Sequence, residues 1–220
     1  YFVVLANKKN DIERIYEPCS RALSELSFDD ITDSAKKFAI IDSRSGLPLW
    51  KLLVAAKDRC CRLVIDCTEP DAASAINYRL CIEKAKSIVG GAKVLLQATG
   101  ALKCIFAAEY YRNTAFASLA EYATDEKLFA LARLEEKYPY GDRVLMQALY
   151  VKTLESGKTA IDEGVLIVSP EAVIALYDAM VSGIPQLDRY ISVCFDNRGK
   201  GGNLCVPRGV TLHDISVFCG

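Results

Sequence analysis

Apolar and polar positions between residues 164 and 193 follow the order of a strand, a helix and a second strand. Val165–Val168 is a continuous apolar run, which is typical of a strand buried on both faces in a parallel sheet. Ser169 is a suitable N-cap for the helix that follows, and Gly183 is a suitable end for it. The helix carries one apolar stripe at helical spacing: Val173, Leu176, Tyr177 and Met180. This stripe is expected to pack on the sheet.

The alternation of strand-like and helix-like segments extends back to residue 62. Apolar runs predict strands at residues 62–68, 102–109 and 127–134, and helical spacing predicts helices over most of 69–99 and at 113–123 and 141–150. Gly90 and Gly91 predict a kink or break in the longest helical segment, and Gly100 predicts its end. Strands that alternate with helices predict a mainly parallel sheet with right-handed crossovers.

The chain departs from this alternation before residue 62 and after residue 187. Before it, we expect a strand at residues 1–6, a poorly patterned helix at 11–26, a helix from Ser27 to about Lys37, and a loop at 39–50 that leads into a helix ending near Ala56. After it, we expect a strand at 188–196, a flexible loop at 197–203, a short strand, a turn at 207–209 and a helix from His213.

Composition places the chain among globular proteins and excludes several partners. At 220 residues and 51% hydrophobic, it is long and apolar enough to bury a core. Its 27 basic and 28 acidic residues give a formal net charge of -1, which shows no bias toward nucleic acid or an anionic membrane surface. No apolar run approaches the ~20 residues that span a bilayer, so we expect no direct membrane insertion.

The nine cysteines include no pair at C-x-x-C spacing, so we expect no zinc or iron–sulfur site within this chain. Their odd number and the lack of a signal peptide indicate a reducing cytoplasm. Adjacent Cys60 and Cys61 are expected to be packing or surface thiols, with a redox pair as the alternative. The chain also opens with Tyr1 inside a strand-like run, from which we expect a segment of a longer protein.

Three segments, in order along the chain, resemble one family. Residues 66–80, DCTEPDAASAINYRL, resemble the pattern N-A-A-E-C-E-P-x-x-x-x-D-x-R-L, and residues 137–149, KYPYGDRVLMQAL, resemble K-Y-P-Q-G-G-E-K-Q-L-I-Y-A. Residues 183–193, GIPQLDRYISV, together with residues 202–220, are similar to G-K-P-L-x-E-R-V-V-T-V followed by G-N-x-x-V-P-I-G-T-P-x-x-x-L. The family is that of RnfC, the peripheral subunit of the Rnf electron-transport complex, with its soluble relatives among cobalamin and proline reductase electron carriers. The likeness covers residues 27–220.

The resemblance implies the α/β fold of the flavin domain in the NADH-oxidising subunit of respiratory complex I, a mainly parallel sheet sandwiched by helices. It divides the chain into the end of a preceding domain and a linker at residues 1–26, that α/β domain at 27–187, and the start of a small β-grasp-like (SLBB-type) domain at 188–220. In the family, a flavin mononucleotide (FMN) accepts hydride from NADH and passes single electrons to iron–sulfur clusters. The implied partners are other electron-transfer subunits or reductases in the cytoplasm, peripheral to a membrane complex.

A flavin phosphate needs several glycines, whose backbone N–H groups can close on the anion. Where the family has G-L-G-G-A-G-F-P, this chain has IDSRSGLP at residues 41–48 and keeps only Gly46 and Pro48. Asp42 would place a negative charge beside the phosphate, and Arg44 would partly compensate by pairing with the phosphate. We expect the net effect to be unfavourable for phosphate binding.

Other flavin contacts of the family are also changed. Asp66 stands at the family's asparagine position, Glu69 keeps its acid, and Gly141 precedes Asp142 at the glutamate position. The segment at residues 168–172 lacks the asparagine and threonine whose amides and hydroxyl contact the flavin in the family. The candidate cofactor-binding residues are therefore Gly46, Asp66, Glu69, Gly141 and Asp142, and no catalytic residue or metal ligand is predicted.

We interpret the chain as a degenerate flavin domain, with an FMN site held by backbone donors as the alternative. The predicted function is a module of an RnfC-like electron-transfer protein, an oxidoreductase-type component if it is active, with iron–sulfur clusters only outside this segment. Two other functions stay open. One is a non-catalytic docking scaffold for an iron–sulfur module elsewhere in the full protein, and the other is a small-metabolite-binding α/β domain without a redox role.

Further candidate residues have simpler structural interpretations. His213 is expected to be solvated or to cap a helix rather than to donate a proton. The acids Asp66, Glu69 and Asp71 fit a helix N-terminus better than a cation site. The Tyr-Tyr-Arg sequence at residues 110–112 fits a loop anchor better than a platform for a flavin ring.

Overall fold

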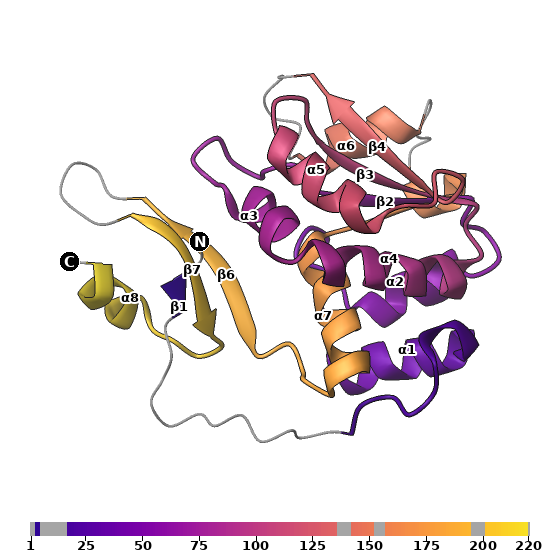
Figure 1. Ribbon diagram of the computed structural model, residues 1–220, viewed down its shortest axis with the longest axis horizontal. Coiled ribbons are helices and arrows are strands. Elements are labelled where there is room, and N and C mark those ends of the chain that lie inside the picture. The colour runs from indigo at the N-terminus through magenta and orange to yellow at the C-terminus, as the bar shows by residue number, and fades with distance from the viewer. Residues whose placement is uncertain (1–2, 5–16, 136–141, 152–156, 195–200, 220) are drawn as a thin grey trace.

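The computed structural model describes residues 3–4, 17–135, 142–151, 157–194 and 201–219 of the chain. Figure 1 shows a larger body, in which helices surround a sheet, and a smaller sheet with one helix set to its side. The larger body holds the candidate site.

A four-stranded, fully parallel sheet forms the centre of the larger body. Its strands lie in the order β4-β3-β2-β5 and have these bounds: β2 (Arg62–Asp66), β3 (Lys103–Glu109), β4 (Phe129–Leu134) and β5 (Val165–Val168). The register places Val64 of β2 beside Ile105 of β3 and Ile167 of β5. The predicted α/β fold with a mainly parallel sheet is therefore confirmed.

Helices cover both faces of this sheet. The helices are α1 (Phe28–Lys37), α2 (Leu49–Ala56), α3 (Ile76–Glu83), α4 (Ala85–Thr99), α5 (Asn113–Tyr122), α6 (Arg143–Tyr150) and α7 (Pro170–Ser182). Two short 3-10 turns, η1 (Leu23–Glu25) and η2 (Ala160–Glu163), accompany them. Leu63 and Ile65 of β2 join the main core with α1 to α5 and α7, whereas Val64 joins a smaller cluster beside α6 and η2. Successive side chains of a strand point to opposite faces of the sheet, so β2 contributes to an apolar layer on each face.

The glycine pair of α4 does not break the helix, so the expected break at this position is wrong, and a kink stays a prediction. Helix α4 runs without interruption through Gly90 and Gly91, and the break in this segment falls at Lys84, between α3 and α4. A Cβ atom at Gly90 would lie 2.3 Å from Cε2 of Tyr177, and one at Gly91 would lie 2.4 Å from the carbonyl oxygen of Val173. The two glycines therefore let α7 approach the backbone of α4.

Helix α7 is buried on nearly all sides and packs mainly on other helices. Val173, Leu176 and Met180 of the predicted stripe are buried, and Tyr177 is half-buried. The helix contacts α4 most extensively and also α3 and α1, and its buried residues share the main core with Leu63 and Ile65 of β2, so the expectation that its stripe packs on the sheet stays a prediction. A helix that is apolar all round is suited to such an interior position.

The smaller sheet joins the beginning and the end of the described chain. It has the order β1-β7-β6, with β1 (Val3–Val4), β6 (Asp188–Val193) and β7 (Gly202–Pro207), followed by α8 (Leu212–Cys219). Val3 pairs in parallel with Leu204, and β6 and β7 are antiparallel. The first strand thus lies in the same sheet as the C-terminal strands. The domain boundaries at residues 26/27 and 187/188 and the β-grasp assignment stay predictions.

The expected helix ends are confirmed, whereas one expected helix is wrong. Ser27 caps α1 in a reciprocal capping box with Asp30, and Gly100 and Gly183 end α4 and α7 in left-handed conformations. The helix expected at residues 11–26 is absent from the described part of that range, residues 17–26, where only η1 forms. Among the helices of the described residues, none has the length and apolar character needed to cross a membrane.

Candidate functional site

The loop between α1 and α2 closes around the carboxylate of Asp42. Its ends are joined by a bridge between Ile41 and Pro48, and Gly46, at φ 69°, donates its N–H to the carbonyl oxygen of Asp42 at 2.9 Å. The Asp42 side chain is fully buried. Its Oδ2 accepts hydrogen bonds from the backbone N–H and the hydroxyl of Ser45, at 2.8 and 2.6 Å. The loop therefore folds onto one of its own acids.

The same carboxylate reaches the beginning of α7. Oδ1 of Asp42 accepts a hydrogen bond from the backbone N–H of Ser169, the N-cap residue, at 2.7 Å. Oγ of Ser169 accepts from the N–H of Ala172 and from that of Ser43, each at 3.3 Å. A negative charge at a helix N-terminus is stabilised by the helix dipole. The N–H groups of Ser43, Ser169 and Ala172 thus already have acceptors within the protein, the Asp42 carboxylate and the Ser169 hydroxyl.

Arg44 pairs with an acid of the protein, at the end of β2. Its Nε lies 3.1 Å from Oδ2 of Asp66, and its guanidinium also donates to the carbonyl oxygen and the hydroxyl of Thr68. Oδ1 of Asp66 accepts from the Thr68 hydroxyl at 2.6 Å. Burial raises the pKa of Asp66 to about 6, against the opposing effects of Arg44 and Thr68. The arginine expected to meet a phosphate is therefore already paired.

Glu69 is buried in the turn that leads to α3. Its Oε2 accepts from the hydroxyl of Ser74 and its Oε1 from the N–H of Tyr78, both at 2.8 Å. Burial raises the pKa of Glu69 above its ordinary value. Asp71 instead accepts from the N–H of Ala73, at 2.8 Å. Glu69 and Asp71 therefore accept hydrogen bonds within the turn that leads to α3. The described residues hold no group of acids, cysteines and histidines arranged to bind a metal ion.

The structure describes only one of the two candidate residues at positions 141 and 142. Gly141 lies outside the described residues. Asp142 is an exposed N-cap of α6, and its Oδ1 accepts from the N–H groups of Val144 and Leu145 at 2.8 and 3.2 Å. Its side chain is thus used in capping the helix.

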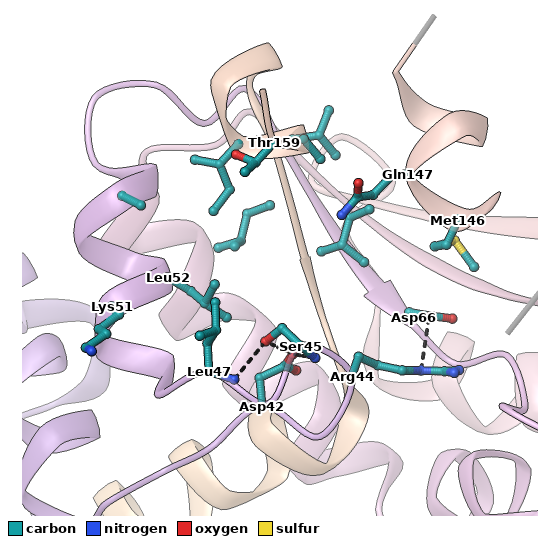
Figure 2. A pocket seen from close by; sticks show the side chains of 16 residues that line it. Asp42, Arg44, Ser45, Leu47, Lys51, Leu52, Asp66, Met146, Gln147 and Thr159 are labelled. Atoms are coloured by element: carbon teal, nitrogen blue, oxygen red, sulfur yellow. Dashed lines mark hydrogen bonds and ion pairs between the residues drawn. The ribbon is translucent and has the colours of Figure 1, made fainter. Parts of the chain in front are cut away.

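A cavity of about 200 Å³ lies beside the Asp42 loop. Figure 2 shows Asp42, Ser45, Arg44 and Asp66 along one side of it, with Thr159 and Gln147 on the opposite side. Most of its lining is apolar and comes from α2, α6, β5 and η2, including Leu52 and Met146. The structure thus brings Asp66 to the cavity next to the Gly46 loop, whereas Glu69 and Asp142 do not line it.

The Tyr-Tyr-Arg sequence after β3 contacts Tyr78 of α3. The Arg112 guanidinium lies 4.5 Å from the ring centre of Tyr78 and 4.9 Å from that of Tyr111. Oε1 of Glu109 accepts from the N–H of Glu69 at 2.9 Å, which ties the end of β3 to the turn after β2. Arg112 thus links the turn after β3 to Tyr78 of α3, as a loop anchor would, but Tyr110 and Tyr111 are exposed, so the preference for an anchor stays a prediction. His213, in the first turn of α8, is exposed.

Several residues at this site were not foreseen. Ser45 and Ser169 bind Asp42, and Thr68 bridges Arg44 and Asp66. The only signal for them is that short hydroxyl side chains commonly bond to nearby backbone groups and acids in turns and caps. That signal gives local partners, as for Ser45, and cannot identify partners more than 100 residues away.

Comparison with known proteins agrees with this architecture. The family model for the Nuo51 FMN-binding domain matches residues 44–178. The chain is 28% identical over 178 residues to the C subunit of the ion-translocating oxidoreductase complex of Buchnera aphidicola subsp. Baizongia pistaciae, covering 80% of this chain and 35% of that relative. It is 23% identical over 206 residues to the C subunit of the proton-translocating ferredoxin:NAD(+) oxidoreductase complex of Clostridium ljungdahlii, covering 92% and 45%.

A solved structure shares the fold. A chain of the air-oxidised NAD+-reducing [NiFe]-hydrogenase superposes with a TM-score of 0.67 at 15% sequence identity, covering 86% of this chain and 38% of that one. The chain spans less than half the length of these relatives. By the extent of the family match and its similarity to these two bacterial relatives, this chain belongs to the Nuo51 FMN-binding domain family and is an RnfC-like protein.

Proposed function

We propose that this chain is the Nuo51-type module of an RnfC-like electron-transfer protein and that its own flavin site is degenerate. The single observation that carries the proposal is the burial of the Asp42 carboxylate against the N–H of Ser169 and both donors of Ser45. In this role the module belongs to a protein that passes electrons between NADH or a reductase partner and iron–sulfur centres.

The residues at the loop do not fit a flavin phosphate. A phosphate at the start of α7 would meet the Asp42 carboxylate at close range, and two like charges repel strongly where water is excluded. Moving Asp42 aside would leave a buried charge without its hydrogen bonds, a change that costs several kcal/mol. Arg44 is paired with Asp66. The phosphate would therefore lose both its donors and its counter-charge.

The cavity beside the loop supports the same conclusion. Its volume of about 200 Å³ lies below the ~300–1,000 Å³ of pockets that enclose drug-sized ligands. This one small cavity is lined by the apolar side chains of Leu52 and Met146 and, at its polar end, by Asp66. Such a space suits a water cluster or a small solute better than a flavin with its phosphate.

The partners follow from the relatives. The Clostridium relative is named as a subunit of a ferredoxin:NAD(+) oxidoreductase complex. We therefore infer that this module works beside other electron-transfer subunits or reductases, with NADH as a possible electron donor to the assembly. Its iron–sulfur centres would lie outside residues 1–220, and the protein would work in the cytoplasm at the periphery of a membrane complex. The docking role is the second candidate function, and the occupied loop favours it for this segment.

The test is a titration with FMN, followed by quenching of flavin fluorescence, on the unaltered protein and on Asp42→Gly and Asp42→Ser variants. We expect no saturable binding to the unaltered protein and a measurable gain in the variants, because Ser169 and Ser45 then offer free donors. Asp71→Ser, which removes an exposed acid outside the loop, is the control and should not gain binding. Stoichiometric binding of FMN by the unaltered protein, with reduction by NADH, would overturn the proposal.

A further inference from the structure

A second cavity, larger than the one beside Asp42, lies along α4. Its volume is about 560 Å³, and it shares no lining residue with the first. One face of α4 supplies most of the lining, at the spacing i, i+3, i+4, i+7, i+8 and i+11: Lys86, Val89, Gly90, Lys93, Val94 and Gln97. Figure 1 shows α4 between α5 and α7, which contribute Tyr122 and Tyr177 to the walls.

The floor and one wall of this cavity are fixed by specific contacts. Gly90 has no side chain, so the ring of Tyr177 lies directly against the backbone of α4. Nε2 of Gln97 donates to the carbonyl oxygens of Ser24 and Leu26, at 3.1 and 2.5 Å, and holds η1 beside the helix. The space between the two tyrosines is therefore held open by the packing of four separate elements.

The lining is cationic and contains no acid. Lys86 and Lys93 are exposed, no aspartate or glutamate lines the cavity, and no ion pair joins either lysine to a carboxylate of the described residues. The two lysines stand seven residues apart on one helix face, or about 10 Å along the axis at 1.5 Å per residue. Their flexible side chains can converge on one anionic group between them.

We propose that this cavity binds an aromatic organic anion. Its flat ring would lie against Tyr122, Tyr177 and the apolar floor, since aromatic side chains contribute large contact areas and favourable ring geometry. Its carboxylate, sulfonate or phosphate group would face Lys86 and Lys93. The volume lies within the ~300–1,000 Å³ of small-molecule pockets, which are mainly apolar with a few placed polar groups. This site is separate from the flavin site and does not rest on the proposed function.

The test uses the aromatic sulfonate 8-anilinonaphthalene-1-sulfonate, whose fluorescence rises on binding. We expect saturable binding by the unaltered protein and at least a tenfold weaker affinity in Lys86→Glu/Lys93→Glu, with weakening as salt increases. Lys51→Glu, which reverses a lysine of the first cavity, is the matched control and should stay within about twofold of the unaltered protein, because it leaves the second cavity unchanged. Tyr122→Ser keeps both charges and should weaken binding by removing one wall.

Competition separates an anion site from a merely apolar one. We expect 2-naphthoate to displace the dye, and the neutral 2-naphthol to do so at least tenfold less well. The proposal is overturned if no saturable binding occurs, if the double lysine variant binds as well as the unaltered protein, if Lys51→Glu has the larger effect, or if both naphthalenes compete equally.

Discussion

Oδ1 of Asp42 accepts a hydrogen bond from the backbone N–H of Ser169 at 2.7 Å, across 127 residues of sequence. This bond ties the loop between α1 and α2 to the N-terminus of α7, and Ser45 completes the coordination of the same carboxylate. An acid of the chain thus lies at the N-terminus of this helix, an end that favours negative charge. The consequences for stability can be measured directly.

Asp42→Asn should lower the free energy of unfolding by about 2–4 kcal/mol. The amide removes the buried charge and turns one acceptor into a donor that faces the N–H and hydroxyl of Ser45, so buried donors lose their partner. Urea denaturation measures this change. Asp71→Asn, at an exposed acid with one local bond, should change the free energy of unfolding by less than about 1 kcal/mol. Equal effects of the two substitutions would mean that the Asp42 bonds contribute nothing specific.

Asp66 should make the protein less stable as pH rises from 4 to 6. Burial raises the pKa of Asp66 from 3.8 to about 6 in the folded protein, so between these values the folded state binds a proton that the unfolded state does not. The stabilisation is complete below pH 4 and is lost as pH passes 6. Its size is roughly 2–3 kcal/mol, at about 1.4 kcal/mol per unit of pKa.

Comparison with Asp66→Asn isolates this contribution from other acids. The difference in unfolding free energy between the unaltered protein and the variant should fall between pH 4 and 6 and be flat above pH 7. A difference that rises over this interval would show that Arg44 outweighs burial and that the pKa of Asp66 is lowered. Chemical denaturation at a series of pH values distinguishes the two.

Gly91→Ala should destabilise the protein by about 2 kcal/mol, although alanine favours helices by about 1 kcal/mol. Its Cβ would meet the carbonyl oxygen of Val173, and a backbone atom in a packed helix has little room to move. Gly90→Ala should cost less, because the half-buried ring of Tyr177 can shift. Thermal or urea unfolding measures both.

Two further variants test this explanation of the glycine pair. Gly202→Ala is the control, since nothing lies within 4 Å of its Cβ position and its φ is not positive, and it should be neutral within about 1 kcal/mol. In a double-mutant cycle, Tyr177→Ala should relieve part of the effect of Gly90→Ala. Strict additivity of these two changes would contradict the close contact.

Gln186→Ala should loosen the junction between the two sheets. Oε1 of Gln186 accepts from the N–H of Ile41 at 3.2 Å and from Arg208 at 3.0 Å, so one buried side chain links the Asp42 loop to the end of β7. We expect a loss of about 1–3 kcal/mol and faster hydrogen exchange in β6 and β7. Arg59→Ala breaks an exposed ion pair with Asp162 and should cost less than about 1 kcal/mol. Unchanged exchange in β6 and β7 would show that Gln186 does not couple them.

Parts of the fold that depend on near neighbours could be predicted from the chain's local pattern. Apolar segments predicted β2, β3, β4 and β5 within a few residues; in β2 and β5 nearly every position is buried, whereas the edge strand β4 alternates between buried or half-buried and exposed positions. Ser27 and Gly183 marked a helix start and a helix end, since a cap needs only atoms within its own turn. The family patterns added the α/β fold and the flavin-type ancestry.

Which distant groups meet depends on the packing of the whole chain. The same local signal in Gly90 and Gly91 favours a helix break or a close helix contact, and the choice depends on Tyr177 and Val173, over 80 residues away. Asp42 and Arg44 were recognised as relevant to an anion, but their partners Ser169 and Asp66 are brought to them by the packing of α7 and β2. A buried charge takes whichever donors the fold places beside it, so its role becomes definite only when the chain has packed.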